Sequence, residues 1–103
     1  MIRLTDALWI GNSEMASNAH SLGINAMLNV AHDLRVWPAR EQEYMQVGLI
    51  DGPGNPLGAY HAAVLALVTL LRRHKQAVVC CHTGTRSMAV ALMYFNATAS
   101  RGW

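Results

Sequence analysis

Over residues 77–87 a short valine-rich apolar run passes directly into a glycine-bearing loop and then into a helical pattern. The segment reads Ala77-Val78-Val79-Cys80-Cys81-His82-Thr83-Gly84-Thr85-Arg86-Ser87. A buried strand that turns tightly into a helix is a repeating unit of parallel α/β sheets. In such sheets the ligand-binding groups lie beyond the carboxyl ends of the strands. The segment therefore predicts an α/β domain whose chemistry is carried by this loop.

The remainder of the chain alternates between the two kinds of element. We expect strands over residues 7–10, 26–30, 44–50 and 77–80, and helices over residues 14–22, 58–74 and 87–99. Ser13 is expected to cap the first helix and Gly23 to end it, and the run 51–56 is rich in turn-forming residues. Together these elements predict one domain over residues 1–103, with a mostly parallel central sheet flanked by helices.

Composition restricts the partners and the compartment. Of the 103 residues, 52% are hydrophobic and 14% are charged, and the net charge is +2. The basic cluster at residues 72–75 ends a predicted helix, where positive charge is favourable, so we expect no nucleic-acid partner. No apolar stretch is long enough to span a bilayer and residues 1–6 lack a signal peptide's apolar part, so we expect a cytoplasmic protein without membrane contact. Cys80 and Cys81 are adjacent, which disfavours a structural disulfide or a metal site, and we expect no cofactor.

The loop has the composition of an oxyanion cradle around a sulfur nucleophile. Backbone amides of a compact loop and of the following helical turn converge on one anion, and Arg86 adds a planar, permanently charged donor. The same groups are expected to lower the pKa of the Cys81 thiol and make it reactive, the alternative being a buried, inert cysteine. Ser87 would either donate a hydrogen bond to the sulfur or cap the helix. The remaining phosphate-binding candidates, whose amides would face the anion while their side chains point outward, are His82, Thr83, Gly84 and Thr85.

Four segments in order resemble the dual-specificity phosphatases of the protein tyrosine phosphatase superfamily. They cover residues 8–12, 22–31, 47–51 and the loop that begins at Cys81. The resemblance implies a cysteine-dependent hydrolase of phosphomonoesters, most readily phosphotyrosine, phosphoserine or phosphothreonine on proteins. It also implies that Cys81 forms a phosphocysteine intermediate, that Arg86 binds phosphate oxygens, and that Asp51 acts as general acid and base. Asp51 also suits a simple turn-forming role, and Asp33 is a weaker substitute for the acid.

The loop departs from that family in its length. Counted from Cys80, Arg86 falls at the C-x5-R spacing but Gly84 comes one place late; counted from Cys81, the glycine is in place but the loop is one residue short. We favour Cys81, because the strand ending at Cys80 delivers the next residue to the reactive edge, and we keep Cys80 as the alternative nucleophile. The chain also stops where relatives continue into further helices, so the C-terminal helices are expected to be missing, and a homo-oligomer is compatible with the short chain.

Two other functions fit the shortened loop. The stretch from Cys81 to Ser87 is similar to the C-x-x-G-x-R loops of rhodanese-type sulfurtransferases, which implies a persulfide carried on Cys81. A catalytically inactive module that binds phosphopeptides is the other. For a phosphatase the expected partner is a phosphoprotein or a small phosphomonoester. For the binding module it is a phosphorylated peptide.

Overall fold

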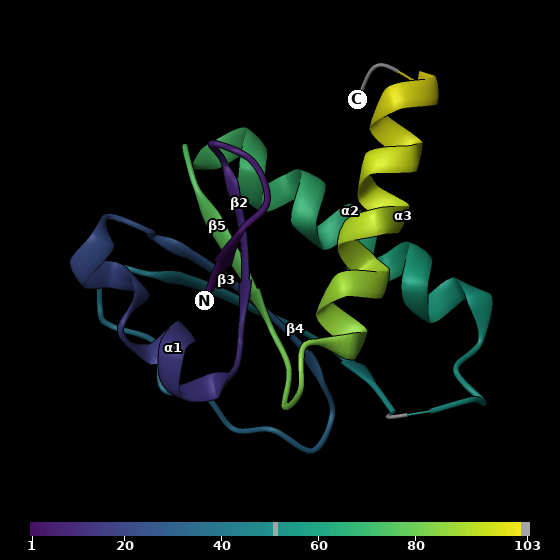
Figure 1. Cartoon of the computed structure of the whole chain (residues 1–103), viewed down its shortest axis with the longest axis horizontal. Coiled ribbons are helices and arrows are strands. Elements are labelled where there is room, and N and C mark those ends of the chain that lie inside the picture. The colour runs from purple at the N-terminus through teal and green to yellow at the C-terminus, as the bar shows by residue number, and fades with distance from the viewer. Residues whose placement is uncertain (51, 102–103) are drawn as a thin grey trace.

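A computed structural model describes residues 1–50 and 52–101 and has a five-stranded sheet at its centre (Figure 1). The strands are β1 (Ile2–Arg3), β2 (Leu8–Gly11), β3 (Ala26–Ala31), β4 (Glu43–Leu49) and β5 (Ala77–Cys80). Their order across the sheet is β1-β2-β5-β3-β4, and only the β1–β2 pair is antiparallel. Because β5 lies between β2 and β3, the last strand of the sequence occupies the middle of the sheet.

Helices lie on both faces of this sheet (Figure 1). They are α1 (Ser13–Ser17), the 3-10 helix η1 (Ala19–Leu22), α2 (Leu57–Arg73) and α3 (Thr85–Arg101). The helices α2 and α3 pack against one another and against β3 and β5, whereas α1 lies on the opposite side beside β2 and β5. Among the described residues, no helix has the length and apolarity needed to cross a membrane.

The two central strands are buried along their whole length. Every residue of β3 and β5 is buried, which is the pattern of parallel strands covered on both faces. The register places Met27 of β3 opposite Val78 of β5, and Gly11 of β2 opposite Cys80. The carboxyl ends of the four parallel strands therefore meet at one edge of the sheet, and the residues that follow each strand are gathered there.

The structure confirms the predicted fold class and each predicted strand to within one residue, and it corrects three local predictions. The first helix is not continuous, since α1 ends at Ser17 and a 3-10 turn follows after Asn18. Its cap is Asn12 and not Ser13, because the Asn12 Oδ1 atom accepts from the Met15 amide at 3.0 Å. The last helix begins at Thr85, two residues earlier than expected, so the loop before it is shorter than predicted.

Candidate active site

The loop after β5 closes around the sulfur of Cys81. The Cys81 Sγ atom accepts hydrogen bonds from the backbone amides of Gly84 at 3.1 Å and Ser87 at 3.4 Å. The Cys81 amide in turn donates to the Gly11 carbonyl oxygen at 3.3 Å, which ties the start of the loop to the end of β2. Gly84 has a φ of +91°, a conformation that glycine adopts without strain, and this permits the tight return into α3. The expected cradle of amides around the sulfur is therefore present.

The two adjacent thiols have opposite pKa shifts. Burial raises the pKa of the Cys80 thiol to about 12, and the neighbouring Cys81 adds to the effect. Burial also raises the pKa of Cys81, but hydrogen bonds from the Ser87 hydroxyl and from the amides of Ser87, Gly84 and Arg86 outweigh it, so its pKa is lowered. Of the two sulfurs, Cys81 is the one whose surroundings favour the thiolate.

The Ser87 hydroxyl makes no capping hydrogen bond within the part of the chain that the structure describes. Ser87 lies in the first turn of α3, is fully buried, and its Oγ atom has no hydrogen-bond partner that meets ordinary geometry among the described residues. The same hydroxyl is nevertheless the largest influence that lowers the pKa of Cys81. Both observations are consistent if the thiolate, a stronger acceptor than the neutral thiol, is the partner that this hydroxyl lacks.

Arg86 is buried and is held by the ends of two other strands. Its side chain is 5% exposed, and its Nη1 atom donates to the Leu49 carbonyl oxygen at 2.8 Å and to Asp33 Oδ1 at 3.0 Å. Leu49 ends β4 and Asp33 follows β3, so the guanidinium joins the loop to both strands. A buried guanidinium with a carboxylate on one nitrogen has a fixed orientation and other N–H donors left for an anion.

Asp33 forms an ion pair with Arg86 in this structure. The hydrogen bond from Arg86 is the largest influence that lowers the pKa of its carboxyl group. The other Asp33 oxygen lies 3.5 Å from His82 Nε2, so the carboxylate also reaches the loop. An ionised carboxylate paired with the arginine is poorly suited to donate a proton, which disfavours the substitute role considered for Asp33.

Asp51, the predicted general acid, lies outside the described residues. The segments on both sides of it are held by Asn55, which sequence reasoning missed. The Asn55 side chain accepts from the Ile50 amide at 2.8 Å and donates to the Ile50 carbonyl oxygen at 2.7 Å, and a longer bond of 3.5 Å reaches the Gly52 carbonyl. An asparagine within a turn-forming run was the available signal, since such side chains bond to nearby backbone.

Asn29 is a second missed residue. It is fully buried in β3, its amide nitrogen donates to the Leu34 carbonyl oxygen at 2.8 Å and to the Tyr44 hydroxyl at 3.0 Å, and its oxygen accepts from the Ala31 amide. These bonds close the turn that presents Asp33. A lone asparagine inside an apolar run was the signal, because a buried amide requires partners.

The remaining loop side chains are exposed, whereas the cysteine that they follow is buried. The side chains of His82, Thr83 and Thr85 are exposed, as predicted, and the Thr83 and Thr85 hydroxyls lie 3.2 Å apart. Cys81 itself has no exposed surface. A phosphoryl group therefore reaches Sγ only when the residues around it shift. Among the described residues, no cluster of three His, Cys, Asp or Glu side chains has the arrangement of a metal site.

Two curated relatives match most of the chain. Dual specificity protein phosphatase 14 of Homo sapiens and that of Bos taurus are each 30% identical to this chain over an alignment of 97 residues. The alignment covers 89% of this chain and 49% of the relative. The chain thus spans about half the length of these relatives. No family model matches the sequence.

Solved structures share the fold. The crystal structure of human DUSP28 superposes with a TM-score of 0.81 at 22% identity, covering 100% of this chain and 74% of that one. A mouse putative dual specificity phosphatase, complexed with zinc tungstate, gives 0.79 at 27% identity over 91% of this chain and 62% of that one. The tyrosine phosphatase OH1 of Orf virus gives a TM-score of 0.72 at 21% identity, covering 99% of this chain and 63% of that one. In sequence and in fold this chain is similar to dual-specificity phosphatases, and both comparisons support its assignment to that family.

Proposed function

We propose that this protein is a cysteine-dependent phosphatase that hydrolyses phosphomonoesters through a phosphocysteine intermediate. The observation that carries the proposal is the lowered pKa of Cys81 beneath the amides of a loop whose arginine is buried and oriented. A thiolate at neutral pH is the form that attacks phosphorus. The opposite shift at Cys80 makes it a poor nucleophile and supports the choice of Cys81.

The reaction has two displacements at phosphorus. In the first, the Cys81 thiolate forms the S–P bond while the ester P–O bond breaks, and Asp51 gives its proton to the departing oxygen. In the second, water attacks phosphorus, its proton passes to Asp51, and the S–P bond breaks to return the thiolate and release inorganic phosphate. Arg86 would neutralise charge on the phosphoryl oxygens in both steps, and Ser87 would donate to the returning thiolate.

The closed loop sets a requirement on binding. Gly84 now donates its amide to the Cys81 sulfur, and the same amide would have to turn toward a phosphate oxygen as the dianion enters. The anion would also share the Arg86 guanidinium with Asp33, since a guanidinium has five N–H donors. The energy of these new charge-assisted bonds is the driving force for opening the loop.

Phosphorylated tyrosine, serine or threonine in proteins is the substrate class we propose, by similarity to the named relatives. We also propose a cytoplasmic location, because a reactive unpaired thiol persists in a reducing compartment.

The test is a side-by-side assay of two reactions on the purified chain. Phosphate release from a small aryl phosphate measures the proposed activity, and thiocyanate formation from thiosulfate and cyanide measures sulfur transfer. We expect phosphate release that is abolished by Cys81→Ser and kept by Cys80→Ala, which removes only the neighbouring sulfur atom. Asp51→Asn should slow phosphate release by about 10²–10⁴, the range of general acid catalysis.

Three outcomes would contradict the proposal in different ways. Loss of activity in Cys80→Ala alone would move the nucleophile to Cys80. Thiocyanate formation without phosphate release, unaffected by Asp51→Asn, would identify a sulfurtransferase. Affinity for a phosphopeptide with neither reaction at any pH would identify a binding module.

A further inference from the structure

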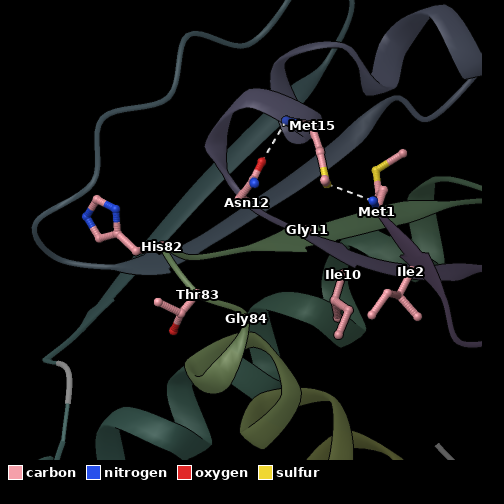
Figure 2. A pocket seen from close by; sticks show the side chains of 9 residues that line it. All are labelled: Met1, Ile2, Ile10, Gly11, Asn12, Met15, His82, Thr83 and Gly84. Atoms are coloured by element: carbon pink, nitrogen blue, oxygen red, sulfur yellow. Dashed lines mark hydrogen bonds between the residues drawn. The ribbon is translucent and has the colours of Figure 1, made fainter.

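Beside the thiol loop lies a pocket of about 190 Å³, and the proposed chemistry uses only the part of its lining that belongs to that loop. It is bounded by the end of β2, the residues around α1, the N-terminal strand and the loop itself (Figure 2). Gly84 belongs to its wall, and the Gly84 amide lies 3.1 Å from the Cys81 sulfur. A group bound in this pocket would therefore be a direct neighbour of a phosphoryl group on Cys81.

The two ends of the pocket differ in polarity. Figure 2 shows His82 and Thr83 on the loop side of the pocket, with the His82 ring directed away from the apolar side chains, which gather on the other side. That end is formed by the side chains of Met1, Ile2, Ile10 and Met15, and it also holds the N-terminal ammonium group of Met1, which donates to the Met15 sulfur at 2.7 Å. A ligand that contacts both sides has a polar or charged part at the loop and an apolar part beside it.

Part of the apolar end is exposed to water. Ile2 is 58% exposed and Met15 is 41% exposed. Covering such surface with an apolar group is favourable, and the unbranched methionine side chains adapt to the shape of whatever enters. Asn12, the other polar residue of the wall, already uses its side-chain oxygen to cap α1, so it offers little to a second ligand.

Size decides between classes of occupant. Pockets that hold whole small-molecule ligands measure ~300–1,000 Å³, and this one is smaller. One aliphatic side chain fits it, whereas a lipid tail is too long. In an extended peptide successive residues are ~3.3 Å apart, so a side chain within two residues of a phosphorylated one reaches the pocket while the phosphate occupies the loop.

We propose that this pocket is a specificity subsite which binds an aliphatic side chain, such as leucine, flanking the phosphorylated residue of a peptide substrate. The inference rests on the proposed phosphatase function and names the substrate feature which that site selects. It makes Met15 and Ile2 specificity-determining residues, although neither contacts the reacting atoms.

The experiment compares phosphotyrosine peptides that differ at one position. Four peptides carry a single leucine, at one of the two positions before phosphotyrosine or one of the two after it, and alanine at the other three. The kcat/KM of each is compared with that of the peptide with alanine at all four. We expect kcat/KM to rise about tenfold for leucine at one of these positions, the discrimination that a small apolar pocket provides. Met15→Gln and Ile2→Thr, both at exposed positions, should reduce that ratio toward one.

Leu22→Gln is the matched control, because Leu22 is 59% exposed and lies outside the pocket. It should leave the leucine-to-alanine ratio at the wild-type value. Thermal unfolding of each variant tests that the fold is intact, and dividing every peptide rate by the rate for an aryl phosphate removes changes in the chemical step.

The outcomes separate this inference from the proposed function. If aryl phosphate is hydrolysed but no leucine preference exists, or Met15→Gln and Ile2→Thr leave the preference unchanged, the subsite is wrong and the phosphatase stands. If no phosphate is released from any substrate, the phosphatase proposal fails and peptide affinities are measured instead. A leucine preference in Kd that Met15→Gln removes then supports the subsite, and equal affinities overturn it.

Discussion

The guanidinium of Arg86 and the carboxylate of Asp33 lie 3.0 Å apart at the end of the sheet, although 53 residues separate them in the chain. The contact joins the thiol loop to the turn after β3, and it orients a buried cation before any anion arrives. A rigid, oriented donor contributes more to binding a charged group than a free one, because its ordering does not have to accompany binding.

Replacing Asp33 by asparagine should loosen Arg86. We expect kcat/KM for an aryl phosphate to fall about tenfold, since small displacements of a catalytic donor are costly. The pKa of Asp33 is lowered in the folded protein, so its contribution to stability is present above its ordinary value of 3.8 and is lost as the pH falls through the folded-state value. Urea midpoints of wild type and variant should therefore differ at pH 7, and the difference should shrink as the pH falls below 3.8; a difference independent of pH would rule out the ion pair as the cause.

Ser87→Ala should separate reactivity from stability. Loss of the hydroxyl is expected to raise the pKa of Cys81, so that alkylation by iodoacetamide shifts to higher pH and phosphatase activity decreases. At a pH low enough to keep Cys81 a neutral thiol, the variant removes a buried hydroxyl that lacks a regular partner, and its free energy of unfolding should stay equal or increase by up to ~1 kcal/mol. Thr98→Ala, which removes a hydroxyl bonded to backbone carbonyls later in α3, should leave the alkylation profile unchanged.

Gly84→Ala and Gly23→Ala form a matched pair. Both glycines have positive φ, +91° and +81°, and a Cβ atom would meet nothing within 4 Å at either position. Each variant should lose ~1 kcal/mol in the free energy of unfolding from backbone strain alone. Only Gly84→Ala should also impair catalysis, because its amide bonds to the Cys81 sulfur. Equal activities of the two variants would show that the amide geometry at residue 84 is unimportant.

Asn55→Ala should act through the segment around Asp51. The variant loses the bonds to both backbone groups of Ile50, and we expect a cost of ~1–2 kcal/mol in stability. If that segment presents a proton donor, kcat should fall by about tenfold or more for phenyl phosphate and much less for dinitrophenyl phosphate, whose leaving group needs no proton. Asn18→Ala, which removes an exposed bond to the Glu14 carbonyl, serves as the control and should alter neither rate. A uniform loss for both substrates would contradict the role of Asn55 in proton transfer.

The central part of the fold was predictable because its residues are buried on both faces. Continuous apolar runs identified β3 and β5, and the spacing of apolar residues identified α2. The strand β1 has two exposed residues and exists through its pairing with β2, so no local pattern indicates it. The interruption of the first helix at Asn18 was likewise hidden, because asparagine forms competing backbone bonds only in the right surroundings.

The part of the site that lies in one continuous segment could be predicted. The contacts that the sheet makes between distant segments could not. The loop from Cys81 to Ser87 is contiguous, so its amides and its arginine could be placed from the sequence. The partners of Arg86 come from the ends of β3 and β4, and their approach depends on the order of strands, which the sequence left open. The burial of the Cys81 sulfur could not be predicted either. It depends on the shape of the loop, and the sequence of a loop that is one residue short does not give its shape.

The different pKa shifts of Cys80 and Cys81 allow the active site to be titrated by alkylation. Both sulfurs are buried, but Cys80 lies within β5 and Cys81 in the loop that follows, so access and thiolate content both favour labelling of Cys81. Near neutral pH an excess of iodoacetamide would mark a single sulfur per chain, because the pKa of the other is about 12. The fraction of label incorporated then gives the concentration of competent molecules in any preparation, and rates can be expressed per working site from the first assay.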